Sequence, residues 1–339
     1  MKYAAAIDVG GTKILGALVD EEGNVRKEIR VPSNLELGGL HVMGKIFELI
    51  DQFCELEKPD AIGIGIGGRI DVEKGVINWG VKPVPHWFGL KVKEMTENRY
   101  HVPCVVDNDV KVAGYGEQWM GAAKGVNSFV CITLGTGIGA AVCIDGKMLH
   151  GSHWSGGEIG HAILYPGGRA CTCGFQGCTE QYLSGTALVN IYNEKAAVKV
   201  NTGYEFFEHV KEKEPLALDV LDQFVDNLCI LLNSLCNTYD PEKFIIGGGL
   251  IDTKEFWWDE LQKKMSISPI NQVYAPVIIP ALLGNRAGYY GSAYIAFQML
   301  NGKLQVEMIP KMFSSIYITQ KTEDLPGHLT GEFLCLLQM

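Results

Sequence analysis

The sequence has no excess of positive charge and no long uninterrupted hydrophobic run. Its 339 residues include 29 lysines and arginines against 39 aspartates and glutamates, a formal charge of −10. This balance excludes a nucleic-acid groove as the main surface, because phosphate backbones are bound by clustered cations. A long uncharged run, residues 127–144, is broken by three glycines. We expect a buried strand–turn–strand there rather than a bilayer helix, and no membrane partner.

A secretory signal is also missing from the first residues. Only five apolar or small residues separate Lys2 from Asp8, too few for the hydrophobic region of a signal peptide. Most of the ten cysteines are scattered along the chain, as Cys54 and Cys229 are. We therefore expect a cytoplasmic protein in which such isolated cysteines are free thiols.

Two segments of the chain repeat one pattern. Residues 3–20 and 129–145 each have the pattern of two apolar strands joined by a tight turn at glycine. Laid over each other without a gap, they share identical residues at three positions: Ile7 and Ile132, Gly10 and Gly135, Asp20 and Asp145. The shared pattern predicts two related domains, each opening with a glycine-cornered hairpin.

Strands and helices alternate around these hairpins. Apolar runs predict short strands at 61–66, 102–106 and 244–246. We expect helices at 110–120 and at 216–239, where apolar residues recur at helical spacing. The alternation predicts an α/β protein, with a ligand beyond the carboxyl ends of the strands in the cleft between the halves. Residues 301–339 are irregular, and no chemistry is assigned to them.

Three glycine turns follow apolar strands. They are Gly10-Gly11-Thr12-Lys13, Gly135-Thr136-Gly137 and Gly247-Gly248-Gly249. Glycines lack a Cβ, so their backbone N–H groups can approach an anion closely, while Thr12 adds a hydroxyl and Lys13 a charge. Any one of these turns alone is more simply a hairpin turn, but three together favour phosphate contacts. The spacing of a Walker A loop is absent.

Polar residues follow the strand predicted at 102–106. Asp107, Asn108 and Asp109 stand where this strand meets a helix. Asp and Asn cap helices well, but one cap needs only one residue. A carboxylate at the carboxyl end of a strand can also serve as a general base toward a hydroxyl.

One histidine and three cysteines form a local cluster. Glu158 and His161 are three residues apart, and His161 is followed by Cys171, Cys173 and Cys178. A Cys₃His set suits tetrahedral zinc, and a site with four protein ligands is structural. Three buried free thiols, or a disulfide, are the alternatives. We expect the metal to hold His161, Glu158 and the nearby Glu180 in place for a sugar ligand.

Together these motifs resemble the ROK family of sugar kinases and repressors. The matching pieces span residues 1 to about 298 in the family's order: Asp8–Lys13, Asp107–Asp109, Leu134–Gly139, Gly157–His161, Cys171–Glu180 and Ile246–Gly249. The resemblance implies the actin-like ATPase fold, which is ribonuclease H-like and duplicated, with two domains around a central cleft. We place the domains at 1–120, closed by a helix near 286–300, and at 121–285, followed by an extension at 301–339.

The resemblance also implies a role for each matching residue. Asp109 is the catalytic base, and the sugar is bound by Gly68, Arg69, Asn108, Asp109, Glu158, His161 and Glu180. ATP phosphates and adenosine are contacted by Gly10, Gly11, Thr12, Lys13, Gly135, Thr136, Gly137, Gly248 and Gly249, with Asp8 orienting Mg²⁺ through water. Structural Zn²⁺ is held by His161, Cys171, Cys173 and Cys178. The expected activity is ATP-dependent phosphorylation of the 6-hydroxyl of a hexose or N-acetylhexosamine by a homodimer.

The sequence departs from the family pattern in the expected sugar pocket. The family's GxPGxVD is replaced at residues 65–71 by Gly-Ile-Gly-Gly-Arg-Ile-Asp, and Pro83 stands where an asparagine usually precedes the tryptophan at 87. The Gly-Gly-Arg triplet resembles that of N-acetylmannosamine kinases. Arg69 is either a reader of the C2 substituent or a surface charge. We predict N-acetylmannosamine as the substrate, with glucose next.

Two other function classes are weighed against a kinase. A sugar-sensing repressor of this family carries a helix-turn-helix before the first glycine turn, and we expect none because Asp8 stands so near the first residue. A sugar-binding sensor without catalysis is the second alternative. The presence of Asp8, Asp109 and both phosphate turns favours the kinase.

Overall fold

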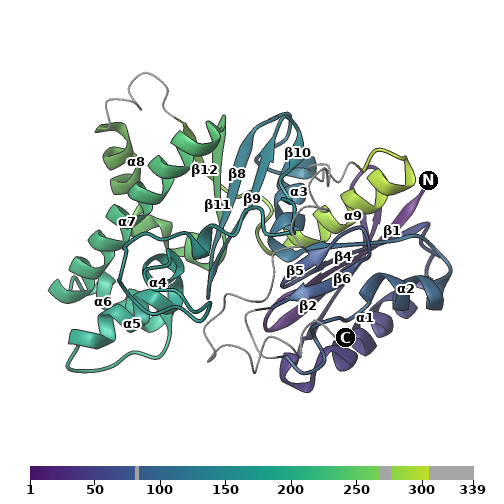
Figure 1. Ribbon diagram of the computed structural model, residues 1–339, viewed down its shortest axis with the longest axis horizontal. Coiled ribbons are helices and arrows are strands. Elements are labelled where there is room, and N and C mark those ends of the chain that lie inside the picture. Colours follow the sequence, from purple (N-terminus) through teal and green to yellow (C-terminus); the bar gives the residue numbers. More distant parts are fainter. Residues whose placement is uncertain (81–83, 268–275, 305–339) are drawn as a thin grey trace, which may run out of the picture. The chain divides into compact units, whose positions relative to one another are not determined.

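The computed structural model describes residues 1–80, 84–267 and 276–304 of the chain (Figure 1). The chain divides into a unit of residues 1–307 and a second of residues 308–339, and the second lies outside the described residues together with Pro83. Among the described helices, none combines the length and the apolar character that a bilayer span requires.

The first sheet has five strands in the order β3-β2-β1-β4-β7. Its strands are β1 (Tyr3–Val9), β2 (Lys13–Asp20), β3 (Val25–Pro32), β4 (Ala61–Ile66) and β7 (Cys104–Asn108). β1 pairs antiparallel with β2 and parallel with β4, which pairs parallel with β7. The central strands are apolar on both faces because both faces are covered, whereas β3 at the edge alternates between half-buried and exposed residues.

The second sheet repeats this order as β10-β9-β8-β11-β12. Its strands are β8 (Phe129–Leu134), β9 (Ile138–Ile144), β10 (Lys147–Met148), β11 (Lys243–Gly247) and β12 (Val277–Pro280). The β8–β9 hairpin takes the place of the β1–β2 hairpin, and β11 lies parallel to β8 as β4 lies parallel to β1. The two hairpins detected as a repeat in the sequence therefore occupy equivalent places in two sheets. A two-stranded sheet joins β5 (Arg69–Asp71) and β6 (Val76–Trp79).

Helices pack against both sheets. They are α1 (Gly39–Cys54), α2 (Val92–Tyr100), α3 (Asp109–Met120), α4 (Glu180–Leu183), α5 (Gly185–Lys195), α6 (Gly203–Lys211), α7 (Pro215–Tyr239), α8 (Trp258–Ile267) and α9 (Ala287–Leu300). Short 3-10 segments lie at Leu35–Leu37, Ile159–His161, Gly249–Phe256 and Gly284–Arg286. The core on the second sheet includes Phe224 and Trp257, whose rings meet edge to face at 5.6 Å.

The last described helix, α9, packs on the first sheet although it follows the second in sequence. It contacts α3, β4 and β1 (Figure 1). The approach is so close that a Cβ on Gly291 would lie 1.6 Å from the carbonyl oxygen of Val112. Ser292 anchors the helix by donating from Oγ to the carbonyl oxygen of Ile7 at 2.9 Å. The proposed domain division near residue 120 stays a prediction.

A buried carboxylate joins α3 to the segment that leads into α9. Glu117 has no exposed surface. Its side chain accepts hydrogen bonds from the backbone N–H groups of Ala122 at 2.7 Å, Leu282 at 3.1 Å and Leu283 at 2.9 Å. Three donors compensate much of the cost of burying this charge, so Glu117 fixes how the chain returns from β12 to the first sheet.

Candidate functional site

A cavity of about 520 Å³ opens at the carboxyl ends of β1, β4, β7 and β8. Thirteen of the residues expected at the site line it: Gly10, Gly11, Thr12, Gly68, Arg69, Asn108, Asp109, Gly135, Thr136, Gly137, Glu158, His161 and Glu180. Asp8, Lys13, Gly248 and Gly249 are not among its lining residues. The cavity therefore collects residues from both hairpins and from the segment that carries the cysteine cluster.

Two glycine turns meet this cavity and are closed in similar ways. Gly10 donates its N–H to the carbonyl oxygen of Lys13 at 2.9 Å, and Gly135 donates to that of Gly137 at 3.0 Å. Glu180 holds the second turn by accepting from the N–H of Ile138 at 3.0 Å. A Cβ on Gly137 would lie 2.4 Å from the Glu180 carboxylate, so a side chain at 137 would displace Glu180 from this position.

The third glycine turn lies behind the second. A Cβ on Gly248 would come within 2.4 Å of the carbonyl oxygen of Leu134, the last residue of β8, and the φ of Gly248 is +83°. Both facts require glycine there. The turn thus packs against the strand that leads into Gly135.

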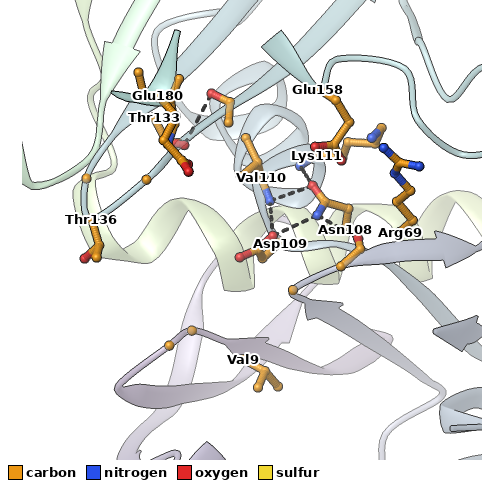
Figure 2. Close-up of a pocket in the computed structure, with 18 of the residues that line it drawn as sticks. Val9, Arg69, Asn108, Asp109, Val110, Lys111, Thr133, Thr136, Glu158 and Glu180 are labelled. Carbon is orange, nitrogen blue, oxygen red and sulfur yellow. Dashed lines mark hydrogen bonds between the residues drawn. The ribbon is translucent and has the colours of Figure 1, made fainter. Parts of the chain in front are cut away.

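Asn108 and Asp109 stand where β7 becomes α3. Asn108 caps the helix, because its Oδ1 accepts from the N–H groups of Val110 at 3.0 Å and Lys111 at 3.1 Å. Its Nδ2 donates to Asp109 Oδ1 at 2.9 Å (Figure 2). The Asp109 Oδ1 also accepts from the N–H of Val110 at 3.0 Å. In the part of the chain that the structure describes, no hydrogen bond reaches Asp109 Oδ2, so one carboxylate oxygen remains available to a ligand.

Two carboxyl groups, those of Asp8 and Asp109, have raised pKa values. Burial raises the pKa of Asp109, and the neighbouring Glu158 raises it further. Burial, helped by Asp109, raises the pKa of Asp8 to about 7. Both groups therefore hold protons more tightly than free carboxyls until a cation is near. Hard oxygen donors of this kind suit Mg²⁺, and Asp8 lies tightly against α9, where a Cβ on Gly288 would be 2.3 Å from its Cγ.

Arg69 reaches the other side of the cavity. It pairs across the β5–β6 ladder with Trp79, and its guanidinium carbon lies 4.7 Å from the centre of the Trp79 ring. Its Nε is buried and has no hydrogen-bond partner among the described residues. Arg69 lines the cavity together with Lys111 and Glu158 (Figure 2). A stacked arginine with an unused donor is suited to bind an acceptor oxygen.

The backbone before Arg69 is held by two side chains. Trp87 donates from Nε1 to the carbonyl oxygen of Gly67 at 3.1 Å, and Asn108 donates from Nδ2 to that of Gly68 at 3.1 Å. The φ of Gly68 is +118°, and a Cβ there would lie 2.5 Å from the carbonyl oxygen of Trp79. The second glycine of the Gly-Gly-Arg triplet is therefore required by the fold.

The histidine and the three cysteines come together in a group whose composition is compatible with a metal ion. The ligand atoms of His161, Cys171, Cys173 and Cys178 all lie within 4.8 Å of one another. The Cys173 and Cys178 sulfurs are 3.5 Å apart, and Cys171 Sγ is 3.7 Å from His161 Nδ1. Zn–S bonds of about 2.3 Å give tetrahedral edges of about 3.8 Å, so the group fits zinc.

The geometry leaves the rest of His161 for the cavity. The metal-facing atom is Nδ1, and His161 also lines the cavity. The backbone N–H of Phe175 lowers the pKa of Cys173, which favours the thiolate form that binds metals. A metal in this group would hold the His161 ring beside Glu158.

Sequence reasoning missed several residues that line the cavity. Trp79 and Thr133 do so, and so does Lys111, which is only 3% exposed. Lys111 carries a signal in the sequence, because a cation in the first turn of a helix opposes the helix dipole. Trp79 carries none, since its place depends on contacts between distant segments.

Comparison with known proteins gives consistent matches. The sequence model of the ROK family matches residues 4–299. The glucokinase of Streptomyces coelicolor is 32% identical over 314 residues, which cover 87% of this chain and 98% of that protein. The ROK hexokinase from Thermus thermophilus superimposes with a TM-score of 0.78 at 30% identity, covering 88% of this chain and 99% of that one.

A second solved structure shows the same likeness. The ROK family glucokinase from Streptomyces griseus, in complex with glucose and AMPPNP, has a TM-score of 0.74 and 30% identity, covering 87% of this chain and 99% of that one. Together with the two repeated sheets, these matches confirm the predicted family resemblance and the predicted actin-like ATPase fold.

Proposed function

The chain belongs to the ROK family, and on that premise we propose that it is an ATP-dependent sugar kinase. The proposed reaction transfers the γ-phosphate of ATP to the 6-hydroxyl of a hexose or N-acetylhexosamine. One observation carries the proposal: the Asp109 carboxylate and both glycine turns line a single cavity. The binding of glucose and AMPPNP by the Streptomyces griseus relative supports the same pair of substrates.

In this proposal Asp109 is the general base. Its Oδ1 is fixed by Asn108 and by the N–H of Val110, which leaves Oδ2 to accept the proton of the sugar hydroxyl. As the proton leaves, the hydroxyl oxygen forms a bond to the γ-phosphorus, the bond from that phosphorus to the β-phosphate oxygen breaks, and ADP departs. The raised pKa of Asp109 matches this task, because it makes the carboxylate a better proton acceptor than an ordinary aspartate.

The turns at 10–12 and 135–137 are assigned to the ATP phosphates. Backbone N–H groups in such turns stabilise phosphate charge without reorganising during the reaction. We assign Asp8 to hold Mg²⁺ through water and Lys13, Gly248 and Gly249 to the nucleotide side. When bound with ATP, Mg²⁺ neutralises charge on the phosphate oxygens.

On the sugar side we propose Asn108, Glu158, His161 and Glu180 as hydroxyl partners and Arg69 as the reader of the C2 substituent. The unpartnered Nε and the stack on Trp79 support this role for Arg69. An acetamido carbonyl at C2 would accept from this guanidinium, whereas the C2 hydroxyl of glucose gains less from it. We therefore place N-acetylmannosamine ahead of glucose.

Zinc is proposed as a structural ion at the Cys₃His group. With four protein ligands it has no open position, so its contribution is to fix the His161 ring and the Cys171–Cys178 segment that leads into Glu180. We also propose a homodimer, which light scattering on the purified protein tests directly.

The test is a coupled ADP-release assay over glucose, mannose, fructose, allose, N-acetylglucosamine and N-acetylmannosamine, with phosphorus NMR of the product. We expect highest kcat/KM with N-acetylmannosamine and a phosphate on O6. Asp109→Asn should lower kcat by about 10²–10⁴-fold while sugar affinity, followed by tryptophan fluorescence, stays similar. Full activity in Asp109→Asn would refute the base assignment.

Two further outcomes have distinct meanings. Sugar binding without ADP release from the native protein would favour the sensor alternative over the kinase. Highest kcat/KM with glucose, unchanged in Arg69→Met, would show that Arg69 does not read a C2 substituent.

A further inference from the structure

A buried histidine–aspartate pair lies directly behind the proposed base. His150 is 2% exposed and Asp107 is 3% exposed. His150 Nε2 is 2.7 Å from Asp107 Oδ2, and His150 Nδ1 is 3.1 Å from the carbonyl oxygen of Met148. None of the family motifs quoted above assigns a role to His150, and Asp107 does not line the cavity.

The hydrogen bonds of the pair fix its proton count. A backbone carbonyl only accepts, so His150 Nδ1 must carry a proton. The other ring nitrogen faces a carboxylate oxygen, and that contact also needs one proton between Nε2 and Oδ2. The pair is therefore an imidazolium with a carboxylate, or a neutral imidazole with a carboxylic acid. In both forms it is neutral overall, which suits a buried place.

Two buried aromatic side chains lie beside the pair. The Trp154 ring meets the His150 ring edge on at 5.9 Å and is itself buried. Tyr115 faces Asp107 from α3, and burial, followed by the charge of Asp107, raises its pKa well above the usual value. Tyr115 therefore remains a neutral phenol beside the pair. A short hydrogen bond in such a place is stronger than one in water.

The pair connects two parts of the proposed sugar site. On one side, Asp107 Oδ1 accepts from the N–H of Asn108 at 2.7 Å, one residue before the base. On the other, the carbonyl oxygen of His150 accepts from the N–H of Gly156 at 2.8 Å, which closes the loop 150–156 just before Glu158. The loop that leads to Glu158 is thus fastened to the end of the strand that leads to Asp109.

We propose that His150 is a positioning residue for phosphoryl transfer. Through the proton that it shares with Asp107, His150 holds loop 150–156 against β7, so that Glu158 and Asp109 contact the same sugar molecule. This inference rests on the proposed kinase function. A sugar held only by the Asp109 side would present its 6-hydroxyl less accurately, and a misplacement of about 1 Å can cost about 10²-fold in rate.

The experiment compares His150→Ala and Asp107→Asn with the control His153→Ala, an exposed residue in the same loop. We expect His150→Ala to lower kcat at saturating sugar and ATP by about 10–100-fold. It should raise the KM for sugar and leave the KM for ATP within about twofold. It should also increase ATP hydrolysis, in which the phosphoryl group goes to water instead of the sugar. His153→Ala should behave as the native protein.

Asp107→Asn separates positioning from charge. An amide of the same shape can donate to Nε2 of a neutral His150 and still accept from the N–H of Asn108. We expect it to retain kcat within about threefold. A loss as large as that of His150→Ala would overturn the positioning role, and so would native kcat and sugar KM in His150→Ala, even with a lowered Tm.

Two readouts do not depend on kinase activity. Nitrogen NMR of the native protein should show the shared proton at His150, and Asp107→Asn should give a neutral ring protonated at Nδ1. Hydrogen exchange should quicken in loop 150–156 of His150→Ala while β8 and β11 stay protected. If the native protein phosphorylates no sugar, the proposed function fails, whereas unchanged exchange in loop 150–156 overturns the inference about His150.

Discussion

Replacing Asp8 with asparagine should change how the stability of the protein depends on pH. In the folded protein the pKa of Asp8 rises from 3.8 to about 7, chiefly because burial disfavours the carboxylate. The folded state therefore binds this proton more tightly than the unfolded state does. It follows that the contribution of Asp8 to stability is present below about pH 4 and is lost as the pH rises to about 7.

The magnitude can be bounded from the same shift. Each pKa unit corresponds to about 1.4 kcal/mol, so a fully buried Asp8 would cost the folded state up to about 4 kcal/mol at pH 8. Asp8 retains some solvent contact, which screens its charge, and we therefore expect about 1–2 kcal/mol. Asp8→Asn carries no such charge, so its stability should not fall over this pH range for that reason.

The assay is urea unfolding at pH 5 and pH 8 without added magnesium or nucleotide. The fall in unfolding free energy between the two pH values should be smaller by about 0.6–1.2 kcal/mol in Asp8→Asn than in the native protein, because part of the effect is already lost below pH 5. Asp252→Asn, which removes an exposed carboxylate outside the cavity lining, should keep the native pH dependence. Equal pH dependence in the native protein and Asp8→Asn would refute the assignment of a buried, destabilised charge at Asp8.

Two further substitutions test the metal group and the buried carboxylate of α3. Cys173→Ser should reduce bound zinc, measured by mass spectrometry, from about one ion per chain to none, and should raise the sugar KM. The control Cys229→Ser on α7 should keep the metal. Full zinc in Cys173→Ser would disprove the ligand set. Glu117→Gln should lower the free energy of unfolding in urea by about 2–4 kcal/mol, because its amide NH₂ group would face backbone N–H donors. The exposed Glu212→Gln should lose less than about 0.5 kcal/mol. A loss as small as that in Glu117→Gln would contradict this role.

The sequence predicted the helices and strands that are determined by their own residues rather than by contacts with distant segments. The strand at 61–66 and the helix over 216–239 match β4 and α7 closely, because long apolar patterns of one period define them. The strand expected at 102–106 instead spans Cys104–Asn108. Pro103 has no N–H to pair in the sheet, and the strand continues until Asn108 caps α3.

The edge strands β3 and β12 were not predicted, and their chemistry explains why. β3 alternates half-buried and exposed residues and is rich in charge, so it contains no apolar run. β12 is short, and its place is set by its register with β11, from Lys243 with Val277 to Ile246 with Pro280. Such strands are specified by the partner strand more than by their own residues.

Part of the candidate site could likewise be predicted from the sequence, and part could not. The glycine turns were found from sequence because their glycines are grouped in short motifs directly after apolar strands, and the Cys₃His group because its four residues are close in the chain. His150 and Asp107 gave no such signal, since 43 residues separate them. A buried pair of this kind is visible only in the folded chain, where the segment after β10 of the second sheet meets the end of β7 of the first sheet.

The departure from the family pattern at Gly67-Gly68-Arg69 is explained by the sequence and the structure together. The sequence showed that a proline was absent, but the structure shows what the second glycine permits: its φ of +118° lets β5 pair with β6 so that Arg69 stands opposite Trp79. A side chain at 68 would collide with the Trp79 carbonyl oxygen. The ring then fixes the guanidinium, and the capping of α3 fixes Asn108 against the Gly68 carbonyl oxygen. Arg69 and Asp109 are thus held by one connected set of contacts, so a change at Gly68 should alter sugar selection and turnover together.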